Sequence, residues 1–272
     1  MLAILQQLKR RILPWGLSFI LAIALRAGCA IALFTVIFTV NCHVATAQST
    51  QKTGETALAT PSARDAFNEA YQNRYTWDEQ FPGYSAEVSL NYQGQLHHGI
   101  VRVKPDLSVE VININREDVR EFVANQLRME TIHRRRVPFE KMHGQNSFKL
   151  EGTDDSGALK IQEVGDKMES HYKVKDKLVT QVNRVMGPVA VTVDTLGTAK
   201  NPEGYLVTHF QTVFRDAETG EVLEKEDVRD FHEKIGKYYL LTNRDIRSTK
   251  QGNPEEKLAA DILIRFNDVQ PL

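Results

Sequence analysis

Alternating apolar and polar positions dominate the chain from residue 84 onward. Between Tyr84 and Tyr92 every second residue is apolar, and the residues between them are Ser85, Glu87, Ser89 and Asn91. This period of two predicts a strand with one buried face and one face in water. Further strands are predicted at residues 95–104, 107–114, 147–151, 158–164, 171–174, 178–186, 189–195, 205–214, 222–231, 238–246 and 258–266. Several connections are too short for a crossover helix, so the sheet should be antiparallel.

Two segments instead show helical spacing. After Ser62 as N-cap, with Asp65 three residues on, apolar residues recur at 66, 67, 70, 71 and 75. A second helix should open with Asn115 as cap and Asp118 at the capping-box position. Its apolar side would carry Val119, Phe122, Val123, Leu127 and Ile132.

These patterns predict a mainly β (α+β) fold for residues 62–272, as a single domain. A long antiparallel meander would form a curved sheet or an unclosed barrel, covered by the two helices. Residues 48–61 hold no aromatic or β-branched aliphatic residue and read as a flexible tether.

Residues 1–47 have the character of a targeting segment. Lys9, Arg10 and Arg11 precede a long apolar run that only Arg26 interrupts, and the small residues Ala45 and Ala47 precede Gln48. This is the pattern of a signal peptide cleaved after Ala47. Because the run is long enough to span a bilayer, a retained membrane anchor is the alternative. Either way we expect an exported protein, in the periplasm or the thylakoid lumen.

Charge and cysteine usage narrow the function classes. Four of the 34 basic residues and none of the 35 acidic ones lie before residue 48, so 30 basic residues face 35 acidic ones beyond it. A mildly acidic domain argues against nucleic-acid binding. Both cysteines, Cys29 and Cys42, lie in the targeting segment. The remaining chain therefore has neither a disulfide framework nor a thiolate zinc site.

Catalytic and metal-binding motifs are missing from the sequence. Its seven histidines beyond residue 47 form no i,i+2 strand pair and no i,i+4 helix pair, the spacings that aim two imidazoles at one metal. There is no Gly-rich phosphate loop and no Gly-x-Ser-x-Gly elbow. We predict no metal and no cofactor, and the sequence gives no support for an enzyme.

One positive cluster stands out in the acidic domain. Arg134, Arg135 and Arg136 follow His133 at the end of the second predicted helix. Cations are favoured at a helix C-terminus by the macrodipole, which is a sufficient structural reason for them. Contact with an anionic membrane surface or a membrane protein is the functional alternative.

Aromatic residues suggest a ligand cavity. A sheet of this length exposes an apolar face that two helices of this size do not seal, and an apolar hollow is a binding site by default. The residues expected to line it, from the first helix and the central strands, are Tyr71, Trp77, Phe81, Phe210 and Phe214.

Several stretches resemble an uncharacterised family found mainly in cyanobacteria, a domain of unknown function. They are Arg74 to Asp78, Phe81 to Tyr84, Val101 to Val111, His133 to Glu140 and Gly204 to Leu206. More loosely, the order of elements is similar to that of LolA-like periplasmic lipoprotein carriers, which by analogy enclose a cavity for acyl chains. The first resemblance implies no known activity, and the second is topological only.

The sequence thus favours an exported carrier or sensor of a lipid or lipid-linked group. An assembly module for a membrane complex and an enzyme working in the same cavity are the alternatives. The expected partner is a lipid or acyl group, with a membrane surface or membrane protein as a second partner.

Overall fold

The computed structural model describes residues 61–165, 169–250 and 260–272, which belong to one compact unit, Pro61–Leu272. The predicted targeting segment, nearly all of the predicted tether and the signal-peptidase site lie outside the described residues. Within them no helix is both long and apolar enough to cross a membrane.

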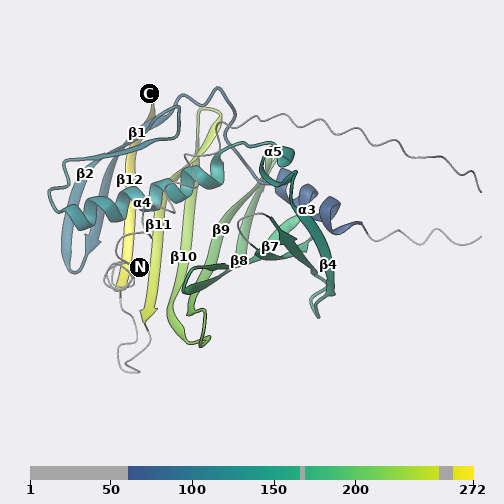
Figure 1. Ribbon diagram of the computed structural model, residues 1–272. Coiled ribbons are helices and arrows are strands. Elements are labelled where there is room, and N and C mark those ends of the chain that lie inside the picture. The colour runs from purple at the N-terminus through teal and green to yellow at the C-terminus, as the bar shows by residue number, and fades with distance from the viewer. Residues whose placement is uncertain (1–60, 166–168, 251–259) are drawn as a thin grey trace, which may run out of the picture. The chain divides into compact units, whose positions relative to one another are not determined.

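One twelve-stranded antiparallel sheet makes up most of the unit, which confirms the predicted fold class (Figure 1). Its strands lie in the order β3-β2-β1-β12-β11-β10-β9-β8-β7-β6-β5-β4, so the first three strands join the far end of a nine-stranded meander. The sheet stays open, with β3 and β4 as its edges. The strands are β1 (Tyr84–Tyr92), β2 (Gln95–Val103), β3 (Val109–Ile112), β4 (Ser147–Thr153), β5 (Leu159–Val164), β6 (Glu169–Lys175), β7 (Leu178–Met186), β8 (Val189–Asn201), β9 (Gly204–Asp216), β10 (Val222–Ile235), β11 (Tyr238–Lys250) and β12 (Ala260–Pro271).

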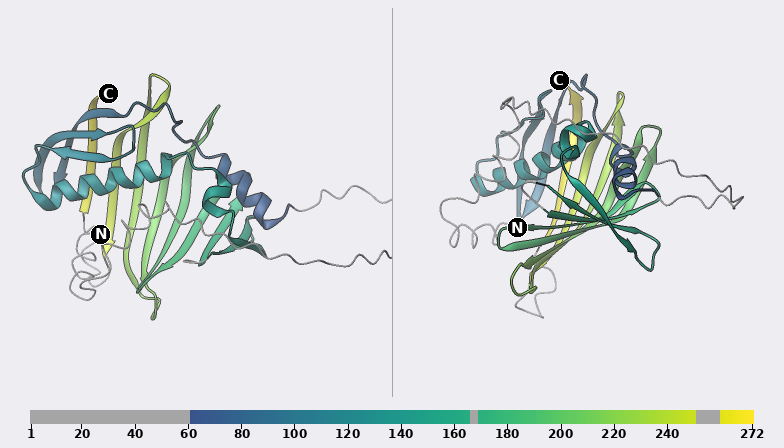
Figure 2. Two further views of the ribbon diagram at one scale, coloured as in Figure 1. Left: turned by 45° about the horizontal axis from the view of Figure 1, so that its top comes forward. Right: turned by 45° about the vertical axis from the view of Figure 1, so that its right-hand side comes forward.

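The three described helices are α3 (Ala63–Gln72), α4 (Glu117–Arg134) and α5 (Phe139–His143). Helix α5 was not predicted, because its five residues are too few to show a helical period. Figure 2 shows α3 and α4 on the same side of the curved sheet, with α3 near β4–β7 and α4 across the β1–β12–β11 region.

Strand register confirms that both helices cover one face. Tyr172, Val182, Val193, Thr212 and Glu226 are successive cross-strand partners from β6 to β10. Paired residues in antiparallel strands point to the same side. The ring of Tyr172 packs on α3. His232 of β10, in phase with Glu226, contacts Glu130 of α4, so this row defines the helix-bearing face.

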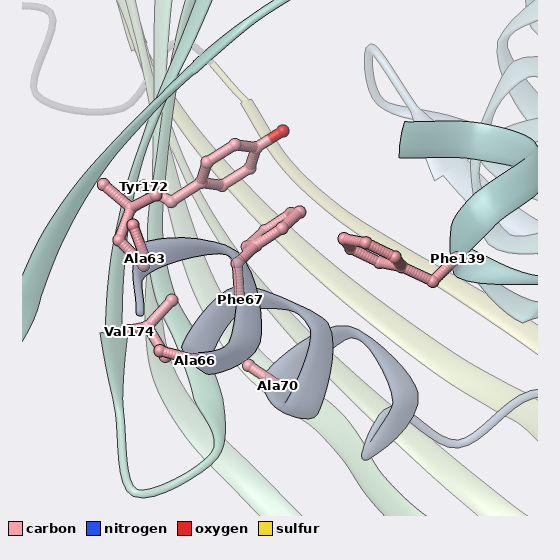
Figure 3. Close-up of a cluster of buried hydrophobic side chains, with 8 residues drawn as sticks. Ala63, Ala66, Phe67, Ala70, Phe139, Tyr172 and Val174 are labelled. Carbon is pink, nitrogen blue, oxygen red and sulfur yellow. The ribbon is translucent and has the colours of Figure 1, made fainter. Parts of the chain in front are cut away.

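Helix α3 covers one end of that face through a small aromatic core (Figure 3). The ring of Phe67 lies between those of Tyr172 and Phe139, with centroids 4.3 Å and 6.1 Å away. Ala63, Ala66 and Ala70 are buried on the same side of the helix, so that its backbone approaches the sheet closely. The predicted helical spacing therefore reflects real packing.

The two predicted helix caps behave differently. The Ser62 hydroxyl accepts a hydrogen bond from the Asp65 backbone N–H, as predicted. The second cap was predicted wrongly: α4 begins after Arg116, which is not a side-chain cap, and the Asp118 carboxylate pairs with the Arg116 guanidinium instead. Ile132 was also misplaced, since its side chain is exposed and not on the buried side of α4.

Ser62→Ala should therefore lower the free energy of unfolding by about 1 kcal/mol, the usual cost of losing an N-cap bond. Asn115→Ala is the matched control and should change it by less than about 0.5 kcal/mol. Urea unfolding of the two variants checks this. Equal losses would mean that Asn115 caps α4 after all.

Candidate functional site

The segment between α3 and β1 crosses the end of the sheet and carries two of the aromatic residues expected at the site. Its backbone is anchored at Tyr75, whose N–H donates to the Tyr205 carbonyl, and at Trp77, whose N–H donates to the Arg134 carbonyl. Gly204 has a φ of +132°, and a Cβ there would lie 2.4 Å from the Asn73 carbonyl oxygen. Only glycine lets the two backbones pair this closely.

Trp77 and Phe81 lie in a packed core, where they hold this segment. Their rings stack at 4.1 Å between centroids, and both side chains are buried. The Trp77 indole N–H also donates to the Tyr239 carbonyl. These two aromatic residues therefore have a structural reason for their positions.

Tyr71 is half-buried at the edge of the α3 core. Its hydroxyl donates to the Val137 carbonyl, and the Arg74 guanidinium lies 4.0 Å from the centre of its ring. Hydrogen bonding and packing thus account for this residue as well.

Phe210 and Phe214 lie elsewhere, on the helix-bearing face of β9. Phe210 pairs with Val228 on β10 and Phe214 pairs with Val191 on β8. Both rings are only half-buried. Together with valines from β7 and β8 they form what we call the central strip. Its members are Val182, Val191, Val193, Phe210 and Phe214.

The central strip lies between the two helical covers. Helix α3 packs on β4–β7, whereas side chains of α4 reach β10 and β11. Strands β8 and β9 lie between, and their apolar side chains on this face are half-buried over most of the strip. The valines of the strip were missed by sequence analysis because only aromatic residues were expected to line the cavity, although Val191 and Val193 alternate cleanly in β8.

Two hollows in the described part of the chain lie beside or beyond the central strip. One, of about 500 Å³, opens where β9 and β10 stop pairing beyond Arg229 and His209. The other, of about 430 Å³, lies over β1 and β2. Neither is lined by a strip residue.

A buried group of charges fastens α4 to the sheet. We call it the α4 ion cluster, and its members are Glu130, Arg134, Asp230, His232 and Arg244. Arg244 donates to both Asp230 carboxylate oxygens, at 2.7 Å and 2.6 Å. Arg134 donates to Glu130 at 2.8 Å, and the His232 Nε2 lies 3.2 Å from the same Glu130 oxygen.

Charge pairing outweighs burial within this cluster. Burial alone would raise the pKa of Glu130, but Arg134, His232 and Arg244 together hold it well below its ordinary value. Glu130 is therefore an ionised carboxylate, paired with the guanidiniums of Arg134 and Arg244.

Glu130, Asp230 and His232 place their ligand atoms within 4.8 Å of one another, a spacing that could hold a metal. The donor set does not fit one. Both Asp230 oxygens already accept from Arg244, and the two guanidiniums supply the positive charge that a metal would bring.

Excess Zn²⁺ or a chelator should consequently leave the thermal midpoint unchanged, because the guanidiniums of Arg134 and Arg244 already balance the carboxylate charge at this site. Differential scanning calorimetry with and without the ion checks this. A Zn²⁺-dependent rise of the midpoint would show that the guanidiniums give way to a metal.

A second polar group lies beneath α5 and ends beside the central strip. Glu163 accepts hydrogen bonds from Asn146 and from the Tyr172 hydroxyl, and its carboxylate contacts His143 Nδ1 at 2.5 Å. The Arg184 Nη2 then donates to the Tyr172 oxygen at 2.9 Å. This chain of hydrogen bonds links α5 to β7.

Burial raises the pKa of Glu163, but the hydrogen bonds from His143, Asn146 and Tyr172 outweigh it and leave the pKa below its ordinary value. Its stabilising effect is therefore fully present above the ordinary carboxyl pKa of about 4.3 and is lost as the pH falls through the lower pKa of the folded protein.

Glu163→Gln should lower stability at neutral pH and flatten the loss of stability in acid. Urea unfolding at a series of pH values measures both effects. Parallel acid profiles for the variant and the unaltered protein would contradict this assignment.

Of the three arginines for which an anionic partner was the alternative to helix-end stabilisation, Arg134 lies in the α4 ion cluster and is buried. Arg135 and Arg136 are exposed, and Arg136 donates to the Thr76 hydroxyl. Of the three arginines, only Arg135 and Arg136 are exposed to an anionic partner.

Fold and site together define an open antiparallel sheet with helices over both ends of one face and an uncovered apolar strip between them. The chain belongs to the family described as "Protein of unknown function (DUF3386)", whose model matches residues 58–272. This confirms the resemblance to a family of unknown function.

Two solved structures are similar to this chain at low identity. A DUF1329 family protein from Desulfovibrio piger ATCC 29098 is 13% identical, with 78% of this chain and 94% of that chain covered and a TM-score of 0.27. MucB, in its complex with MucA(peri), is 9% identical, with 77% and 98% covered and a TM-score of 0.21. Similarities this weak say nothing about function. No curated protein matches the chain.

Proposed function

We propose that this protein is a non-enzymatic carrier or sensor of a lipid or lipid-linked group, which binds the apolar part of its ligand over the central strip. The observation that carries the proposal is the half-burial of Phe210 and Phe214 between two regions of the same face that helices cover. Water over such side chains is displaced at a gain of roughly 25 cal/mol per Å².

The chemistry of the strip favours an acyl chain. Its five members are valines and phenylalanines, and the one hydroxyl between the two phenylalanines on this face, that of Thr212, belongs to a buried residue. From Phe210 to Phe214 the strip runs roughly 13 Å along β9, at about 3.3 Å per residue, which suits an extended chain.

The expected targeting segment supports a site of action in the periplasm or thylakoid lumen. The topological likeness to LolA-like carriers and the likeness to a mainly cyanobacterial family agree with that choice. We propose that Phe210 and Phe214 contact the ligand. The helical cover beside them is supported by Tyr71, Trp77 and Phe81. Arg135 and Arg136 stay as candidate contacts for a membrane surface or a membrane protein.

Mass spectrometry of organic extracts from the purified protein tests this function. We expect lipid in the unaltered protein and its loss in Phe210→Asn, which places an amide on the strip. Phe231→Asn is the matched control, because Phe231 also lies on a central strand but is 56% exposed. The next residue, His232, contacts Glu130 of α4, so the Phe231 ring faces the other side of the sheet.

Lipid in the Phe210→Asn protein at the level of the control would contradict a site on the strip. Absence of lipid from all three proteins, together with no binding of added acyl ligands, would refute the carrier function and leave the assembly module as the better hypothesis.

A further inference from the structure

We propose that the ligand is a single-chain amphiphile with an anionic head, which Arg184 binds at the β7 side of the central strip. This inference rests on the proposed function and adds the chemical class of the ligand to it. The observation behind it is a guanidinium on an apolar face without a carboxylate partner.

Register places Arg184 on the helix-bearing face beside the strip. It pairs with Val191 on β8, which in turn pairs with Phe214 on β9. The head of a ligand at Arg184 would therefore continue directly into a tail over these two residues.

The Arg184 side chain is half-buried, and its hydrogen-bonding capacity is not filled by the described residues. Its Nη2 donates to the Tyr172 hydroxyl at 2.9 Å, whereas its Nε is buried and has no hydrogen-bond partner among them. A buried N–H without a partner costs free energy, and a ligand oxygen would recover that cost.

The charge of Arg184 is likewise unpaired. None of the described residues places a carboxylate within 4.0 Å of it, whereas Arg134 pairs with Glu130 and Arg244 pairs with both Asp230 and Glu130. The nearest acid in the hydrogen-bond chain, Glu163, is reached only through Tyr172 and is already occupied by His143 and Asn146.

Tyr172 fixes the direction of these bonds. Its hydroxyl has one proton, which it donates to Glu163, so its oxygen accepts from Arg184 and cannot also donate to a ligand. The free N–H groups of the guanidinium are thus the donors available to an anion. A planar fork of this kind suits the paired oxygens of a carboxylate or phosphate.

A buried carboxylate on β10, at the opposite side of the strip from Arg184, determines which way the ligand lies. In the same row of paired residues, Phe214 is followed on β10 by Glu224, a buried carboxylate that accepts a hydrogen bond from Ser248. An anionic head is disfavoured near Glu224 and favoured near Arg184, about three strand spacings away, or roughly 14 Å.

The test compares octadecenoic acid with the alcohol of the same chain length, by displacement of a neutral apolar dye from the purified protein. The unaltered protein should bind the acid about 10- to 100-fold more tightly than the alcohol, the range expected for hydrogen bonds to a charged group. In Arg184→Gln the affinity for the acid should fall to that for the alcohol, which itself should not change.

Two further variants separate this effect from damage to the fold. Arg184→Lys keeps the charge and loses the fork, so it should retain part of the preference for the acid. Arg215→Gln should retain all of it, because Arg215 pairs with Ala190 and so lies on the opposite face from Val191 and Phe214. Short-chain acetate and inorganic phosphate should not displace the dye, because the tail supplies much of the affinity.

Equal affinity for acid and alcohol in the unaltered protein, or an Arg184→Gln protein that still prefers the acid, would overturn the anionic head while the carrier function stands. Failure of both probes to bind would refute both proposals. Displacement by phosphate alone would show an anion site that does not depend on an acyl tail, and would also overturn the inference.

Discussion

Replacing Arg244 with Met is expected to lower the free energy of unfolding by about 3–5 kcal/mol, the range found when one partner of a buried ion pair is removed. The variant leaves the Asp230 carboxylate without its two hydrogen bonds and takes one guanidinium away from Glu130. It also removes the contact of Arg244 with Gln126 on α4. The measurement is urea unfolding followed by circular dichroism.

Arg247→Met on the same strand is the matched control. The Arg247 side chain is 52% exposed and meets Asp245 and Asp261 only at 3.7 Å and 3.8 Å. Exposed pairs of this kind contribute about 0–1 kcal/mol. If both variants lose the same small amount, water reaches the α4 ion cluster and it does not fasten the helix.

The second large expected effect is a difference in unfolding free energy between alanine variants of an aromatic core residue and of an aromatic residue of the central strip. Phe81→Ala should cost about 3–5 kcal/mol of unfolding free energy, because the ring is 4% exposed and packs against Trp77 and Tyr238. Phe210→Ala, the same change at a half-buried ring, should cost clearly less while it weakens ligand binding.

Thermal or urea unfolding of the two alanine variants makes the comparison directly. Since the side chain removed is identical, any difference in stability reflects the environment of the ring. Equal losses at the two positions would mean that Phe210 is packed as a core residue, and the central strip would then be ordinary core.

Sequence patterning was sufficient for most of the sheet. Strand β7 was predicted with its observed bounds, since turn residues mark both of its ends. Strands β8 to β12 run further than predicted, because hydrophobic alternation does not continue into their outer ends. The place of β12 next to β1 could not be predicted, since pairing between distant strands leaves no local pattern.

The functional residues were harder to predict, for a related reason. Glu130 and Arg134 have the i,i+4 spacing of a helix pair, but their burial depends on Asp230 and Arg244, whose pairing is set by register. Arg184 lies in a strand whose apolar residues do not alternate, so no pattern assigned it to a face. Phe210 and Phe214 were found because they share a strand face with Leu206 in a segment of mixed character.

The most direct test of binding on the central strip is methyl NMR of the valines during titration with octadecenoic acid. We predict saturable shifts at Val182, Val191 and Val193, with little change at Val101 and Val103, which are buried in β2. Shifts confined to other parts of the protein, or none at concentrations where the acid binds, would contradict the account.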